Sequence, residues 1–228
     1  MRGHATWRSA ALAVAIIVDS AACSYPALPR LDSVDAPPPV DSPSTTPPLA
    51  LDCNTYCTQL TAACTGTDAQ ITAANCMRTC LAYPLGAQAD TAGNTLGCRN
   101  YHIQNITVRG MSAAIHCPHA GPAGATLSAA TGVCGASACD NFCAMEVRIC
   151  GTDAAPVTGI TNRYTDMNAC MTACAGFAKT PEYSTATTTG NTLACRVYHL
   201  TNAAAQTVGT MANNHCGHTL ATATALCI

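Results

Sequence analysis

Side chains that build large hydrophobic cores or carry out catalysis are scarce in this sequence. Only 10% of the 228 residues are charged and 4% are aromatic, and the single tryptophan, Trp7, lies near the N-terminus. Aromatic side chains bury large apolar areas, and catalysis needs positioned acids and bases. The composition therefore calls for a source of stability other than a large core, and it gives little support to an enzyme.

Motifs that identify a reaction are also absent. C-x-x-C does not occur, which argues against a thioredoxin-like redox pair and, as C-x-x-C-H, against covalent haem attachment. H-E-x-x-H, G-x-S-x-G and Gly-rich phosphate loops are missing. After residue 22 the chain has eight basic and eleven acidic residues, without the basic surplus of a nucleic-acid-binding protein. We expect no nucleic-acid partner and no familiar catalytic site.

Cysteine, in contrast, is abundant, with seventeen residues. Such a number predicts metal clusters in a cytosolic protein and disulfides in an exported one. The N-terminal residues indicate export, because Arg2 and Arg8 accompany an apolar run from Ala10 to Val18 and small residues follow at 20–22. This pattern predicts a secretory signal peptide at residues 1–22, too short to span a membrane.

The stretch SAAC at residues 20–23 resembles a bacterial lipobox, in which the cysteine is lipidated after cleavage. It departs from that pattern at Ser20, where leucine is preferred, and at Asp19, which ends the apolar run. The resemblance implies a lipid anchor on Cys23, which is also the one cysteine outside the repeats described below. Ser24 resembles the second residue of lipoproteins sent to the outer membrane. The alternative is an ordinary signal-peptidase cut at the same bond, leaving Cys23 free or in an intermolecular disulfide.

Residues 23–52 form a Pro-rich segment with eight of the thirteen prolines of the chain. Such a segment stays extended and buries no core, and it can reach about 90 Å at about 3.1 Å per residue. We expect a disordered stalk, or a plain spacer, with the folded part beginning near Cys53.

The decapeptides GNTLGCRNYH, from Gly93, and GNTLACRVYH, from Gly190, are almost the same. Each belongs to a longer unit with the pattern C-x3-C-x6-C, a variable stretch, C-x3-C and then the decapeptide. The shared order predicts two tandem repeats, at residues 53–136 and 137–228. Their cysteines, which we expect in disulfides, are Cys53, Cys57, Cys64, Cys76, Cys80, Cys98, Cys117 and Cys134, and then Cys139, Cys143, Cys150, Cys170, Cys174, Cys195, Cys216 and Cys227.

The cysteine spacing predicts helices. At about 100° per residue, the first three cysteines of each repeat fall on one stripe of a helix. The fourth and fifth cysteines again have helical spacing, in TAANCMRTC and TDMNACMTAC, which open on Thr or Asp as N-cap candidates. A third helix is expected to begin at Asn94-Thr95 and at Asn191-Thr192.

Over about thirty residues per repeat, the twin C-x3-C pairs resemble those of plant α-hairpinins and of small mitochondrial inner-membrane chaperones. The resemblance implies a helical hairpin with an outer and an inner disulfide. It implies no activity, because these families have unrelated functions. The implied pairs are Cys53–Cys80 and Cys57–Cys76 in the first repeat, and Cys139–Cys174 and Cys143–Cys170 in the second.

Four cysteines of each repeat remain outside the hairpin. Cys64 shares the hairpin stripe and the third helix comes next, so we predict Cys64–Cys98 and, in the second repeat, Cys150–Cys195. The remaining pairs, Cys117–Cys134 and Cys216–Cys227, then close local loops. A Cys64–Cys117 pair is the alternative, and it would bring His116 to the hairpin.

Apart from His4, every histidine belongs to a set that recurs in both repeats. One histidine lies four residues after the cysteine of the third helix, and two follow in HCPH or HCGH. Three imidazoles per repeat suit zinc, copper or haem. The alternative is structural polar packing, and Arg99 and Arg196 are expected to cap carbonyls or pair with an acid. The candidate ligands are His102, His116, His119, His199, His215 and His218.

The sequence thus predicts a mainly α, disulfide-rich protein with two repeats, each a stapled hairpin plus a third helix and a Cys-closed loop. We expect an exported, lipid-anchored protein of a Gram-negative cell envelope, at the outer membrane or cell surface, or else periplasmic or secreted. Its leading function is non-catalytic binding of a protein or small ligand, or a structural role. The alternatives are a metal- or haem-binding module and, third, an enzyme with an unfamiliar site.

Overall fold

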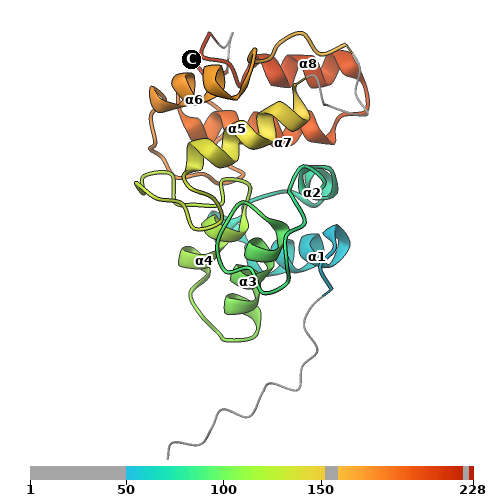
Figure 1. The fold of residues 1–228 in the computed structure, drawn as a ribbon, viewed down its shortest axis with the longest axis vertical. Helices are drawn as coiled ribbons and strands as arrows, with labels where there is room; N and C mark the ends of the chain where they lie inside the picture. Colours follow the sequence, from blue (N-terminus) through green and yellow to red (C-terminus); the bar gives the residue numbers. More distant parts are fainter. Residues whose placement is uncertain (1–49, 152–158, 223–225) are drawn as a thin grey trace, which may run out of the picture. The chain divides into compact units, whose positions relative to one another are not determined.

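The computed structural model describes residues 50–151, 159–222 and 226–228 (Figure 1). The predicted signal peptide, Cys23 and nearly all of the stalk lie outside the described residues. None of the described helices is both long and apolar enough to span a bilayer. Eight disulfides within these ranges indicate an oxidising environment.

The described part is mainly helical, as the cysteine stripes predict, and an isolated bridge between Ala178 and Thr192 is its only β-pairing. A short 3-10 helix, η1, spans Gly66–Asp68. The α-helices of the first half are α1 (Cys53–Ala63), α2 (Ala73–Cys80), α3 (Leu96–Thr107) and α4 (Ala113–Ala120). Those of the second half are α5 (Ala138–Ile149), α6 (Met167–Ala175), α7 (Leu193–Ala205) and α8 (Gly209–Gly217).

The first two helices of each half form the expected stapled hairpin. Helix α1 begins after Asp52, whose carboxylate accepts a hydrogen bond from the Thr55 amide at 2.9 Å, and Asp166 caps α6 in the same way at 2.8 Å. The outer disulfides are Cys53–Cys80 and Cys139–Cys174, and the inner ones are Cys57–Cys76 and Cys143–Cys170. These are the pairs that the hairpin resemblance implies.

The repeated GNTL sequence forms a turn that starts the third helix. Gly93 has φ +88° and Gly190 has φ +93°, in the left-handed region where a residue without Cβ is favoured. Two residues later, the hydroxyl of Thr95 accepts a hydrogen bond from the Cys98 amide at 3.2 Å, and Thr192 caps α7 in the same way at 3.1 Å. The predicted helix starts are therefore confirmed.

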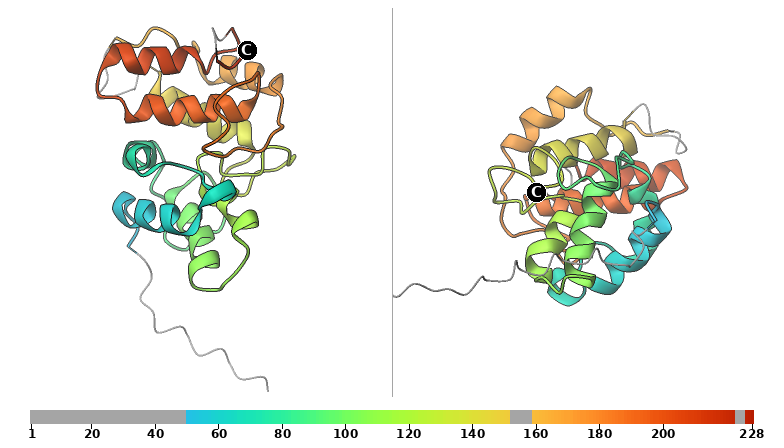
Figure 2. Two further views of the ribbon diagram at one scale, coloured as in Figure 1. Left: turned by 180° about the vertical axis from the view of Figure 1, so that it is seen from behind. Right: turned by 60° about the horizontal axis from the view of Figure 1, so that its bottom comes forward.

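A fourth helix, which we did not predict, precedes the predicted Cys-closed loop in each half and overlaps only its first residues. Helices α4 and α8 each follow a short turn and pack against α3 and α7 respectively (Figure 2). Pro118 lies inside α4, within its last turn, so that only one intrahelical hydrogen bond is lost. The histidine-bearing segments are thereby helical rather than looped.

The predicted pairings outside the hairpins are wrong. Cys64–Cys98 and Cys150–Cys195 do not form, and neither do Cys117–Cys134 and Cys216–Cys227. Helix α4 contacts α1, and the cysteine of each fourth helix bonds the cysteine at the C-terminal end of the first hairpin helix instead. The observed pairs are Cys64–Cys117, Cys150–Cys216, Cys98–Cys134 and Cys195–Cys227.

The two halves pack against each other within one compact unit that spans residues 46–228. Helix α2 contacts α7, and the Asn75 amide donates a hydrogen bond to Asn202 Oδ1 at 3.1 Å (Figures 1 and 2). The Glu182 carboxylate accepts hydrogen bonds from the backbone amides of Leu127 and Ser128, at 2.6 and 3.1 Å. The two halves are therefore joined both through α7 and through the segment that precedes it.

Candidate metal centres

Each third helix places one histidine toward the fourth helix of its half. His102 lies one turn after Cys98 on α3, and His199 lies one turn after Cys195 on α7. Both imidazoles are buried, at 5% and 3% exposure. Each histidine lies on the same helix face as the disulfide cysteine one turn before it, and the N-terminus of the helix is capped by a threonine.

Buried arginines hold the N-terminal turn of each third helix. Arg99 and Arg196 donate hydrogen bonds to the carbonyls of Thr95 and Thr192, at 3.2 and 3.0 Å. Each guanidinium also stacks on an aromatic ring, at 3.9 Å from Tyr83 in one half and 3.8 Å from Phe177 in the other. They cap carbonyls, as the sequence suggests.

The first triad consists of His102 from α3 with His116 and His119 from α4. The Nδ1 atoms of His102 and His116 are 3.0 Å apart, and the ring of His119 packs edge-on against that of His102 at 4.8 Å. One ring nitrogen from each residue lies within 4.8 Å of the others. His119 Nδ1 is buried and has no hydrogen-bond partner among the described residues. The sequence identified these three residues but did not predict that they converge.

The second triad consists of His199 from α7 with His215 and His218 from α8. His199 Nδ1 lies 3.1 Å from His215 Nδ1 and 3.2 Å from His218 Nδ1. Its other ring nitrogen, Nε2, lies 3.2 Å from the carbonyl oxygen of Thr188. Because a carbonyl only accepts, Nε2 carries the proton, and Nδ1 of neutral His199 offers a lone pair to both neighbours.

The neutral form of the imidazoles is favoured in both triads. Burial lowers the pKa of His102 to about 4, and repulsion from His119 and His116 adds to the effect. Burial and the neighbouring His218 lower the pKa of His199 to about 4 as well. The other triad pKa values are lowered by burial too. Neutral imidazole is the form that ligates a metal.

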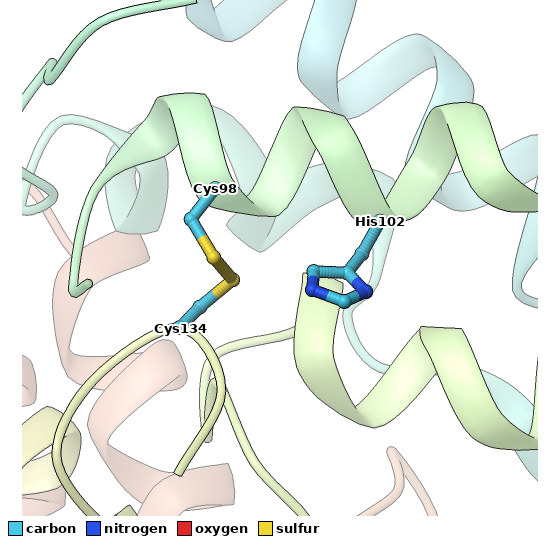
Figure 3. Close-up of side chains that lie close together, drawn as sticks. All are labelled: Cys98, His102 and Cys134. Atoms are coloured by element: carbon cyan, nitrogen blue, oxygen red, sulfur yellow. A yellow bond between two sulfur atoms is a disulfide. The ribbon is translucent and has the colours of Figure 1, made fainter. Parts of the chain in front are cut away.

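A disulfide lies beside each triad. Figure 3 shows the Cys98–Cys134 disulfide and the His102 imidazole next to each other on the same side of α3. Ligand atoms of these three residues lie within 4.8 Å, as do those of Cys195, His199 and Cys227. A metal binds thiolate, however, and sulfur in a disulfide has none to offer. While the disulfides are intact, the histidine triads are the groups of this set that offer free ligand atoms.

The triad spacing suits a small cation better than a set of imidazole hydrogen bonds. An imidazole nitrogen has a single in-plane lone pair, so His199 Nδ1 can accept well from only one of its two close neighbours. Ligand nitrogens at about 2.0–2.1 Å from zinc lie about 3.3 Å apart in tetrahedral geometry. The nearest nitrogen pairs of the triads are 3.0 to 3.2 Å apart, and all ligand nitrogens of a triad lie within 4.8 Å of one another. A cation would satisfy all three lone pairs together.

Three further groups lie near the triads, and of these only Asn105 had a signal in the sequence, as a repeated residue on the histidine face of the third helix. The Thr188 carbonyl fixes His199, the Asn105 side chain lies 3.5 Å from His116 Nδ1, and Arg109 bonds Asn105. Asn105 recurs on the histidine face as Asn202, but Asn202 bonds Asn75 and not the triad. Arg109 has no counterpart arginine.

Comparison with known proteins gives one partial likeness. Residues 49–140 match the family model described as the BfoA family C-terminal domain. No curated protein and no solved structure matches the chain. The matched range contains all eight disulfide cysteines of the first half, together with His102, His116 and His119, so the likeness covers one complete triad.

Proposed function

We propose that this is an exported, non-catalytic metal-binding protein that holds two zinc or copper ions, one in each histidine triad. The observation that carries the proposal is the position of His199 Nδ1, 3.1 and 3.2 Å from two further imidazole nitrogens. Because His199 Nε2 donates its proton to the Thr188 carbonyl, the lone pair of this imidazole lies on Nδ1 and points into the triad. Imidazole nitrogens are ligands that suit both zinc and copper.

An ion is favoured over haem by the packing of the rings. In the first triad the ring centroids lie 4.8 to 6.1 Å apart, and in the second 4.5 to 6.1 Å. In a haem held by two histidines, the iron and its macrocycle lie between the two ligand nitrogens, whereas the closest nitrogens are only 3.0 Å apart in the first triad and 3.1 Å apart in the second. The triads leave no such gap.

A binding role is favoured over catalysis by the makeup of the triads. Within the described residues, the groups able to hold a metal contain histidine and disulfide cysteine but no carboxylate. Hydrolytic zinc sites commonly combine the metal with a carboxylate base. Storage, transport or sensing of the ion needs only the ligands.

Zinc counting with single-site variants tests the proposal. We expect the protein to bind two Zn²⁺ ions, H119A and H218A to bind one each, and the double variant to bind none. Losing one of three ligands should weaken that site by roughly 100-fold or more. His119 and His218 are both partly exposed, so the fold should tolerate their replacement.

Native mass spectrometry and calorimetric titration with Zn²⁺ and then Cu²⁺ give the stoichiometry. N214A, an exposed position next to His215 and outside the triad, is the matched control and should still bind two ions. A wild-type protein that binds no more zinc or copper than the double variant would refute the proposal.

We also propose that the protein reaches the envelope surface through lipidation of Cys23. The support is the secretory pattern of residues 1–22 and the pairing of every other cysteine. We expect C23S to leave the membrane fraction while keeping its zinc stoichiometry, since Cys23 belongs to neither histidine triad. Fractionation of cells, followed by blotting, measures this. Unchanged membrane association of C23S would argue against the anchor.

A further inference from the structure

The two triads have different hydrogen-bond partners outside the ligand set. His199 Nε2 faces the Thr188 carbonyl at 3.2 Å, which holds the proton away from the metal-facing Nδ1. His102 Nε2 is buried and has no hydrogen-bond partner among the described residues. The proton of neutral His102 therefore rests equally well on Nδ1, where it bonds His116 and would have to leave before an ion binds.

A neighbouring asparagine also opposes binding in the first triad only. Asn105 Oδ1 accepts a hydrogen bond from the Arg109 guanidinium, which has only donors, so this contact fixes the amide orientation. The amide nitrogen of Asn105 is thereby directed at His116 Nδ1, at 3.5 Å. It thus presents donor hydrogens to a lone pair that an ion needs.

The corresponding asparagine of the second half is turned away from its triad. Asn202 Oδ1 accepts from Asn75 at 3.1 Å, and its amide nitrogen donates to the Tyr198 carbonyl at 2.9 Å. Neither atom of this amide is bonded to a triad histidine. Contact between α2 and α7 therefore keeps the Asn202 amide away from the second triad.

Charge adds to the difference. The Arg109 guanidinium lies 5.0 Å from the centre of the Tyr101 ring, which packs edge-on against His102 at 5.2 Å. This places a permanent positive charge beside the first triad, where it repels a divalent cation. The residue four positions after Asn202, which matches Arg109, is the neutral Gln206.

We infer that the two triads bind divalent ions with unequal affinity, that the His199 triad fills first, and that Arg109 sets the difference by holding Asn105 against His116. The inference rests on the proposed function and adds the order of filling. It also assigns Arg109 as a positioning residue, because it acts through Asn105 and does not ligate the ion.

Zinc affinities of isolated sites test the inference. H218A leaves the first triad and H119A leaves the second, so each dissociation constant can be measured separately by competition with a chromogenic zinc chelator. We expect the first triad to bind about tenfold more weakly. In the H218A background, R109Q should tighten binding about three- to tenfold, because it removes the charge and releases the amide of Asn105.

The reciprocal change, Q206R in the H119A background, should weaken the second triad by a similar factor. R78Q, which removes an exposed arginine from α2, is the control and should change neither constant. Equal affinities, a reversed order, or no response to R109Q would overturn the inference and leave the proposed function intact. Absence of zinc from both single-site variants and the wild type would instead refute the proposed function.

Discussion

Replacing Cys64 and Cys117 together by alanine is expected to lower the free energy of unfolding by about 4 kcal/mol. In the chain-entropy account, a disulfide restricts the unfolded chain more as the loop it closes lengthens, and this one closes a separation of 53 residues. A small domain has only about 5–15 kcal/mol of net stability. The variant should therefore remain folded with its seven other disulfides but unfold at clearly lower urea concentration.

The same variant should lose zinc affinity at the first triad by about tenfold. His116 directly precedes Cys117, so this disulfide fixes the histidine's backbone to the end of α1. Without it, α4 is held to α1 only by packing and by the hydrogen bond that the Tyr56 hydroxyl donates to the Ala120 carbonyl, so ordering His116 opposes binding. The zinc constant is best measured in the H218A background, where only the first triad binds.

The inner hairpin disulfide supplies the control. Cys57–Cys76 closes a separation of 19 residues, which predicts a loss of about 3 kcal/mol when both become alanine. Neither cysteine is next to a triad histidine, so zinc affinity should stay within about twofold. Equal losses of zinc affinity in the two double variants would contradict a local role for Cys64–Cys117, whatever the urea curves show.

The helices could be predicted where cysteine periodicity and capping agree. The stripe of Cys53, Cys57 and Cys64 appears as α1, and the Thr95 and Thr192 caps begin α3 and α7 where the decapeptide places them. These signals are local, because a helix face and a cap are decided within about one turn. Local signals of this kind can therefore be recognised in a single sequence.

The fourth helices could not be predicted because their sequences contain residues that disfavour helices. Pro118 lies within α4, while α8 begins at Gly209 and ends at Gly217. Proline and glycine lower intrinsic helix propensity by about 3 and 1 kcal/mol relative to alanine. Packing against α3 and α7, together with the anchoring disulfides, outweighs that preference, and packing cannot be read from the segment itself.

The convergence of the histidines could not be predicted either, because it depends on how the fourth helices pack. Local loop closure favoured Cys117–Cys134, yet closure entropy changes by only about 0.6 kcal/mol for each doubling of loop length. Such a small preference cannot decide a pairing against the packing of α4 on α1. With Cys64 paired to Cys117, His116 comes to the hairpin, which is the outcome the alternative pairing implied.

Replacing Glu146 by leucine is expected to stabilise the protein by about 3 kcal/mol at pH 8 and much less at pH 4. Glu146 lies in α5 with 0% exposure, and both carboxylate oxygens lack a hydrogen-bond partner among the described residues. The matching residue of the first half is Leu60, seven positions after the first cysteine, and it is also 0% exposed. Leucine therefore suits this position of the hairpin.

The pH dependence follows from the pKa of the carboxyl group. Burial raises the pKa of Glu146 from 4.5 to about 7, with the nearby backbone amide of Tyr164 and then the charge of Arg163 offsetting part of the shift. Between these values the unfolded chain releases a proton that the folded chain keeps, so stability falls as pH rises from about 4.5 to 7. The loss reaches about 3 kcal/mol above pH 7 and vanishes below pH 4, where both states are protonated.

Urea unfolding of wild type and E146L at pH 4 and pH 8 measures the effect. The triad histidines, whose pKa values are lowered, destabilise the fold in acid, but they do so equally in both proteins and cancel in the difference. E146Q separates charge from polarity: it removes the ionisable group, and with it the pH dependence, but still buries an amide in need of partners. A difference between wild type and E146L that is the same at both pH values would mean that Glu146 is ionised in the folded protein throughout, with a partner that compensates its charge.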